Sequence, residues 1–192
     1  MKILGIDLAG SDKRNTGIAF KYNGKIVTTI VKTDEEILSI CENFNYIFID
    51  APLSLPEGKE NIENRDGKHY RECDQMLRKM NIKFFPITLG PMRMLTSRGI
   101  KLYGKLLKKN KKVYEVFPGA FYDIMGISRK NKNEIIRFYE KLNIKIEKNK
   151  CSLDELDAIA CFLTGFMFLN KKATLLKGKD GCIIIPKKVK VV

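Results

Sequence analysis

Two aspartates stand where the most apolar strands of the chain are expected to end. Asp7 follows the run 3–6, and Asp50 follows the run 47–49. If these strands are parallel neighbours, both carboxylates emerge at one edge of the sheet, which is where ligands bind in open α/β sheets. A single acid after a strand is usually a turn or cap residue. Two of them, each ending a hydrophobic strand, indicate a carboxylate site.

A second pair of acids lies near the start of a predicted helix over 152–170. Ser152 and Glu155 form a capping box, so the helix begins there. Asp154 then falls in the first turn, where the helix dipole alone would explain an acid. Asp157 lies beyond that turn, on a stripe of small residues suited to packing against a sheet. A carboxylate on such a stripe costs several kcal/mol unless it is paired or binds a cation.

The chain has one further acid in an unfavourable place, Glu115, inside the apolar run 113–117. A buried strand offers an anion no inexpensive position. Glu115 therefore either pairs with a Lys or Arg or joins the other acids, and the sequence leaves both open. We include it among the candidate catalytic residues.

Converging carboxylates favour a particular kind of metal site. Hard cations take oxygen ligands, so Mg²⁺ or Mn²⁺ is the expected cofactor. Two such ions about 3.5–4 Å apart can activate water and stabilise the leaving oxygen in phosphodiester cleavage. The predicted ligands are Asp7, Asp50, Asp154 and Asp157.

Composition excludes several other chemistries. The 192 residues contain a single histidine, His69, so a His-based zinc site or a Ser-His-Asp triad has almost nothing to be built from. Five widely spaced cysteines without a Cys-x-x-Cys pair indicate a reducing compartment, and we expect a cytoplasmic protein. No apolar run is long enough to span a membrane, and a strand at the N-terminus leaves no room for a secretory signal.

The chain is strongly basic. Lys and Arg number 36 against 22 Asp and Glu, which gives a formal net charge of +14. This excess fits a nucleic-acid partner, and it equally fits a surface that is rich in Lys throughout. The basic runs 108–112 and 187–190 are the places where a groove for a polyanion is expected. The oligomeric state is left open.

The elements that must position these residues follow from patterning. Three strands come first (2–8, 17–22 and 25–32), the last two joined by an Asn-Gly turn. A helix, a strand over 46–49, helices over 70–80 and 92–109, and a strand over 113–117 come next, followed by helices over 132–142 and 152–170. We predict one α/β domain over 1–192, with a mixed five-stranded sheet (three antiparallel strands, then parallel strands) and helices on both faces. A charged insertion near 57–70 and a C-terminal hairpin near 173–192 complete it.

Three motifs resemble those of ribonuclease-H-like nucleases: GIDLAG at 5–10, IDAPL at 49–53 and DELDAIA at 154–160. The closest likeness is to an uncharacterised group of predicted nucleases, the domain of unknown function 429. Further similar segments are RECD at 71–74 with Arg78, Phe85-Pro86, and YEVFP at 114–118. The resemblance covers most of the chain and implies a ribonuclease-H-like fold and metal-dependent cleavage of a nucleic acid.

The same resemblance implies a role for each acid. Asp7 would bridge both metals, and Asp50 would hold one of them. Asp157, with Asp154, would supply carboxylates from the last helix, as in RuvC-type junction resolvases. Those resolvases tend to have glutamate where this chain has Asp50.

Two arginines complete the candidate site. Arg71, Asp74 and Arg78 share one helix face, so they form either a surface ladder of ion pairs or, through the arginines, contacts to substrate phosphates. We include Arg71 and Arg78 as candidate substrate-binding residues.

Two other functions fit parts of the sequence. The segment 7–11, with Thr16-Gly17 behind it, resembles the first phosphate loop of actin- and hexokinase-type ATP-binding proteins. Those proteins normally enclose the nucleotide between two domains, and no second loop of this kind follows Asp50. The third possibility is a nucleic-acid-binding module whose acids are purely structural.

Overall fold

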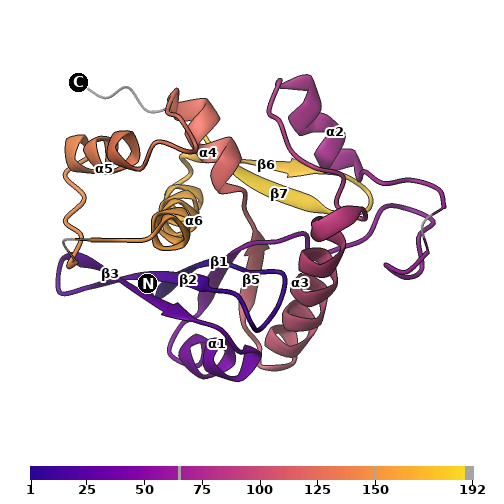
Figure 1. Ribbon diagram of the computed structural model, residues 1–192, viewed down its shortest axis with the longest axis horizontal. Helices are drawn as coiled ribbons and strands as arrows, with labels where there is room; N and C mark the ends of the chain where they lie inside the picture. The colour runs from indigo at the N-terminus through magenta and orange to yellow at the C-terminus, as the bar shows by residue number, and fades with distance from the viewer. Residues whose placement is uncertain (65, 149, 189–192) are drawn as a thin grey trace.

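The computed structural model describes residues 1–64, 66–148 and 150–188. The elements follow one another along the chain as shown in Figure 1: β1 (Ile3–Asp7), β2 (Thr16–Tyr22), β3 (Lys25–Val31), α1 (Asp34–Cys41), β4 (Tyr46–Asp50), α2 (Glu72–Lys79), α3 (Gly90–Lys108), β5 (Lys112–Glu115), α4 (Pro118–Met125), α5 (Lys132–Lys141), α6 (Leu153–Leu169), β6 (Ala173–Lys177) and β7 (Cys182–Pro186).

The main sheet has the strand order β3-β2-β1-β4-β5. Strand β2 is antiparallel to β1 and β3, whereas β4 is parallel to β1 and β5. Asn23 and Gly24, both with positive φ, form the tight turn that makes β2 and β3 a hairpin. The predicted mixed five-stranded sheet is therefore confirmed.

Alternate residues of the strands enter two hydrophobic cores, one on each face of the sheet. Leu4 of β1 packs with Ile37 of α1 and Leu102 of α3 on one face. Ile3 of the same strand packs on the other face with residues of α4, α5 and α6. Figure 1 shows the result, with α1 below the sheet and α6 above it. Helices cover both faces, as predicted.

Helix α6 lies unusually close to the sheet because glycines face it. A Cβ added to Gly5 of β1 would come within 2.3 Å of the Ala158 carbonyl oxygen. One added to Gly17 of β2 would lie 2.0 Å from the carbonyl oxygen of Asp154. These contacts are with helix backbone, which cannot turn aside as a side chain can. Direct contact between the backbone of α6 and the backbone of β1 and β2 therefore fixes the position of the helix over these strands.

We expect Gly5→Ala to destabilise the protein by at least about 1–3 kcal/mol, because the added methyl group has no space to occupy. Gly104→Ala is the matched control. Gly104 lies in the helix α3 with open space where its Cβ would be, and alanine there should be neutral or stabilising by up to about 1 kcal/mol. Urea unfolding of both variants measures the difference. Equal stability of the two variants would contradict the close packing.

One helix was not predicted from the sequence. Pro118-Gly119 reads as the end of a strand, yet Pro118 is the first residue of α4. Proline suits this position because its fixed φ is helical and its missing N–H needs no partner. Gly126, in the left-handed conformation, ends the helix.

The segment between β4 and α2 contains no helix or strand among its described residues, and it includes the charged stretch near 57–70. Strands β6 and β7 form an antiparallel hairpin, and residues 189–192 of the predicted 173–192 segment lie outside the described residues. No helix in the described part of the chain is both long and apolar enough to cross a membrane.

Candidate active site

The ends of β1 and β4 bring Asp7 and Asp50 together. The two residues are register partners in the parallel pair, so neighbouring strands hold their backbones roughly 5 Å apart. Asp50 lies two residues after Phe48, which packs in the core beneath α6, and Asp7 lies two after Gly5, which touches α6. Because side chains alternate along a strand, both carboxyl groups point to the face that α6 covers.

Helix α6 adds Asp157 and Asp154 from above. The predicted capping box is present, with the Ser152 hydroxyl accepting from the Glu155 N–H and the Glu155 carboxylate accepting from the Ser152 N–H. One turn after Asp157, the Cys161 thiol donates a hydrogen bond to the carbonyl oxygen of Ile6. This bond joins α6 to β1 at the residue directly before Asp7. We refer to Asp7, Asp50, Asp154 and Asp157 as the acid site.

A tyrosine from the unpredicted helix α4 fixes the orientation of one acid. The Tyr122 hydroxyl donates to the Asp157 carboxylate at 2.7 Å. Tyr139 of α5 lies behind it, with the two phenol oxygens 3.3 Å apart, and its own hydroxyl donates to the carbonyl oxygen of Leu156. Both rings are buried. Asp157 is therefore held by a side chain that is itself firmly packed.

Burial and neighbouring negative charges raise the pKa values of three acids of the site, Asp7, Asp50 and Asp157. Burial raises the pKa of the Asp50 carboxyl to about 8, with the charges of Asp157 and Glu115 adding to the effect. Burial, and then the charges of Asp50 and Asp157, raises the pKa of Asp7 well above its usual range. Burial raises the pKa of Asp157 to about 6, and the hydrogen bond from Tyr122 opposes this rise. Without a cation, the site holds protons near neutral pH.

The chemistry of this donor set fits a hard divalent cation. The site offers carboxylate oxygens, and burial with the neighbouring negative charges raises the pKa values of Asp7 and Asp50, so these groups hold protons. A cation would replace these protons and relieve the repulsion. Across the described ranges, no three His, Cys, Asp or Glu side chains are arranged closely enough to hold a metal ion as they stand. Binding would thus require the carboxyl groups to lose protons and turn toward the ion.

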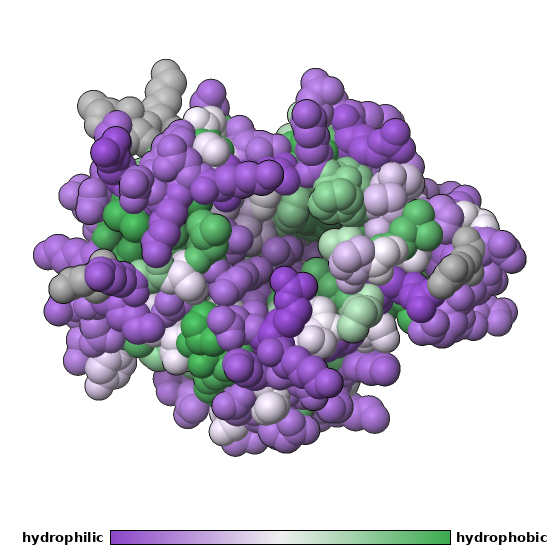
Figure 2. All heavy atoms as spheres, in the orientation of Figure 1, coloured by the Kyte–Doolittle hydropathy of each residue, from purple (hydrophilic) through white to green (hydrophobic). Residues whose placement is uncertain are grey.

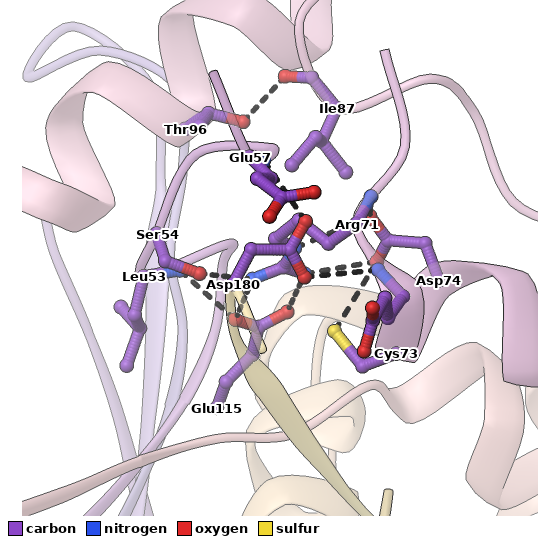
Figure 3. Close-up of polar contacts among 11 residues, drawn as sticks. Leu53, Ser54, Glu57, Arg71, Cys73, Asp74, Ile87, Thr96, Glu115 and Asp180 are labelled. Carbon is purple, nitrogen blue, oxygen red and sulfur yellow. Dashed lines mark hydrogen bonds and ion pairs between the residues drawn. The ribbon is translucent and has the colours of Figure 1, made fainter. Parts of the chain in front are cut away.

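Glu115 is not among these acids, because it points to the other face of the sheet. Its register partner is Ile49, which packs in the core beneath α1 and α3. The Glu115 carboxylate accepts two hydrogen bonds from the Arg71 guanidinium, at 2.6 and 2.7 Å, and a third from the Leu53 N–H (Figure 3). Of the two possibilities left open by the sequence, the structure has the ion pair.

Arg71 is equally engaged, which differs from the expected contact with substrate. Its side chain is about 1% exposed and also donates to Asp74 and to the Ser54 hydroxyl (Figure 3). All three guanidinium nitrogens have partners and the side chain is buried, so a phosphate cannot reach it. Arg71 is instead the N-cap residue of α2, with its N–H donating to the Asp74 carboxylate and its side chain buried.

Arg78 remains accessible. It lies on the exposed side of α2, with its guanidinium 5.1 Å from the centre of the Tyr70 ring. The basic run 108–112 lies elsewhere, because it joins the end of α3 to the start of β5 and the acids follow the opposite ends of the parallel strands. Two of its lysines, Lys109 and Lys111, bond to Glu42. Of the run 187–190, residues 189 and 190 lie outside the described residues.

Arg129, in the loop between α4 and α5, was missed by the sequence analysis. Its positive charge opposes the rise in the pKa values of both Asp50 and Asp157, so it acts electrostatically on the acid site. Asp123 and the carbonyl oxygen of Lys83 hold it in place, and it lies over the Phe117 ring at 5.1 Å. No local pattern marks this arginine, because all of these contacts are tertiary.

Sheet order and helix placement define a ribonuclease-H-like α/β fold with carboxylates at the ends of its central parallel strands. The chain belongs to the family described as "Protein of unknown function (DUF429)", which matches residues 5–180. The predicted family is therefore confirmed. No curated protein matches the sequence.

A solved structure of RuvC from Thermus thermophilus is similar in fold. RuvC in complex with a Holliday junction substrate has 10% sequence identity and a TM-score of 0.50, covering 94% of this chain and 99% of that one. A second RuvC structure has 13% identity and a TM-score of 0.49, covering 89% and 96%. At such low identity the likeness establishes the fold alone.

Proposed function

We propose that this protein is a metal-dependent nuclease that hydrolyses phosphodiester bonds at the acid site. The observation that carries the proposal is the convergence of Asp7 and Asp50, as register partners, with Asp157 of α6. Half-buried carboxyl groups with raised pKa values are typical of functional sites, because gathering them costs stability that a purely structural region has no reason to lose.

Each acid has a distinct position from which to hold Mg²⁺ or Mn²⁺. The charges of Asp50, Asp157 and Asp154 all act on Asp7, so Asp7 is the residue suited to bridging two ions. Asp154 is on the same helix as Asp157, and its charge acts on both Asp157 and Asp7. When bound, divalent ions activate water and stabilise the leaving oxygen in phosphodiester cleavage. Tyr122 keeps Asp157 oriented for this task, in the way that groups behind metal ligands commonly do.

The substrate we propose is nucleic acid. A formal net charge of +14 supports a polyanionic partner. Arg129, whose charge acts on the acids, and Arg78 on α2 are the cations from which phosphate contacts are expected, whereas Arg71 is not. The RuvC of similar fold was solved with a Holliday junction, so branched DNA belongs among the substrates to be tested.

Cleavage assays with the purified full chain test the proposal. Single-stranded, duplex, hybrid and branched nucleic acids would be offered with Mg²⁺ or Mn²⁺ and with a chelator. We expect cleavage that requires the metal, and Asp7→Asn should lower its rate by at least about 100-fold, equal to ~3 kcal/mol, because a bridging carboxylate is lost. Asp12→Asn is the control, since Asp12 is an exposed acid in the turn after β1.

Three results would contradict the proposal. Cleavage that persists unchanged in Asp7→Asn would separate the activity from the acid site. Binding of nucleic acid without cleavage of any substrate would favour a binding module. Tight calorimetric binding of ATP with Mg²⁺ would favour a relative of actin- and hexokinase-type proteins.

A further inference from the structure

A small pocket opens beside Asp50, between the end of β4 and the segment that joins α2 to α3. Its volume is about 110 Å³. The residues that give it its character are apolar or aromatic: Phe84, Phe85, Met92, Leu95 and Phe117. We call this the aromatic pocket. Engineered cavities that enclose one benzene ring measure roughly 150 Å³, so this smaller pocket, which opens to the surface, can take part of one flat ring and nothing larger.

The pocket forms part of an exposed hydrophobic area. Phe85 is about 75% exposed, and Met94 and Leu89 of the adjoining segment are exposed as well. Figure 2 shows hydrophobic side chains gathered on the surface in the region between α2 and α3, amid a largely hydrophilic face. Only Phe85 of these three residues lines the pocket, and Leu89 and Met94 lie outside it at the start of α3. Single exposed apolar residues are ordinary, but a group of them next to a pocket indicates a binding site.

Cations border the aromatic rings on two sides. Arg129 lies over the Phe117 ring at 5.1 Å. Arg78 lies over Tyr70 at 5.1 Å, and Tyr70 meets the Phe84 ring edge to face at 5.8 Å between centroids. Aromatic rings with arginines beside them make a surface complementary to nucleotides, since the rings stack on bases and the cations attract phosphates.

The polar groups at the floor of the pocket are already paired. Arg71, Asp74 and Glu115 line it, and their hydrogen bonds are directed at one another. A base that entered would therefore find apolar faces and few free donors or acceptors. Stacking of this kind accepts any base, because every base has a flat π-face.

We propose that the aromatic pocket receives one unpaired nucleobase of the substrate, an inference that rests on the proposed nuclease function. Asp50 borders both the pocket and the acid site, so the base and the phosphate to be cleaved belong to neighbouring positions of one strand. In a perfect duplex the bases are stacked inside and cannot enter. The substrate is thus a single strand, or a duplex with a bulge or branch that frees a base.

Binding measurements in the Asp7→Asn background, where cleavage is suppressed, test this inference. Fluorescence anisotropy with Mn²⁺ would compare a labelled perfect duplex, the same duplex with one extra unpaired adenine, and the single strand. We expect the bulged duplex and the single strand to bind about 5- to 150-fold more tightly than the perfect duplex. Adding Phe85→Ala should remove most of that preference and leave affinity for the perfect duplex unchanged.

Two further variants sharpen the test. Phe85→Trp keeps a ring at the mouth of the pocket and should keep the preference. Tyr22→Ala removes a ring that is about 63% exposed at the end of β2, outside the pocket, and should also keep it. Both Phe85 and Tyr22 are exposed enough that their loss should leave the fold intact.

Failure of the pocket and failure of the nuclease proposal would look different. Suppose that wild-type cleavage requires metal and Asp7. Equal affinity for all three probes, or a preference unaffected by Phe85→Ala, would then overturn the base-binding proposal and leave the nuclease proposal standing. An equal loss for all three probes in Phe85→Ala would do the same. If neither the wild type nor any variant binds or cleaves the probes, the nuclease proposal itself is wrong.

Discussion

The metal-free protein is expected to become less stable as the pH rises from about 4 to about 8. Asp50 has an ordinary pKa near 3.9 in the unfolded chain and a pKa of about 8 in the folded protein, and the pKa of Asp157 rises to about 6. Between the pKa of the unfolded chain and the higher pKa values of the folded protein, the folded state binds more protons than the unfolded state. Raising the pH through this range therefore favours unfolding. The acids' contribution to stability is complete below pH 4 and is lost as the pH passes through the folded values.

The expected loss is on the order of 2–5 kcal/mol, because one pKa unit corresponds to about 1.4 kcal/mol and the carboxyl groups keep some contact with solvent. Urea unfolding at intervals from pH 4 to pH 8 with a chelator present measures it. Asp50→Asn should flatten the dependence and make the metal-free protein more stable than the wild type at pH 8. Asp12→Asn should reproduce the wild-type curve. Stability that increases with pH in the wild type would contradict the placement of the acids.

The same protons link stability to the metal. Mn²⁺ must displace them, so it should raise the melting temperature more at pH 8 than at pH 5. In Asp50→Asn the metal-induced rise should be smaller at both pH values. An effect of Mn²⁺ that is identical in wild type and Asp50→Asn would place the ion elsewhere.

Arg71→Met is expected to cost about 3–5 kcal/mol, since it leaves Glu115 and Asp74 buried without their shared cation. The deficit relative to wild type should be smaller at pH 5 than at pH 8, because burial already raises the pKa of Glu115 and the free carboxyl would take up a proton.

A triple variant separates the loss of the pair from a loss of packing. Replacing Arg71, Glu115 and Asp74 together by Met, Leu and Leu removes every charge of the network, and it should recover much of the lost stability. Unfolding by urea at both pH values reports all of these variants. A triple variant no more stable than Arg71→Met would mean that the stability lost in Arg71→Met comes from lost packing and not from unpaired buried charges.

Local patterns predicted the part of the site that local structure determines. The apolar runs before Asp7 and Asp50 and the capping box at Ser152 each lie within one element, so the strands and the start of α6 could be placed from sequence. The alignment of Asp7 with Asp50 then followed from parallel pairing alone.

Contacts between distant segments were beyond such patterns. Glu115 and its partner Arg71 lie 44 residues apart, and only the register of β5 against β4 decides which face Glu115 occupies. Tyr122 was hidden because its helix begins with a Pro-Gly pair that is also a strand-ending signal. The net positive charge does not indicate where on the surface a polyanion would bind. The basic run 108–112 lies at the end of the sheet opposite to the acid site.

The glycines beneath α6 have a consequence for how this protein can vary. Backbone contact at Gly5 and Gly17 fixes the spacing of the acids within the sheet and α6, without help from the segment between β4 and α3. That segment carries Phe84, Phe85 and the exposed arginine of α2. Exposed side chains of that segment, such as Phe85, can therefore be exchanged without moving the acids, provided that the buried Arg71 is kept.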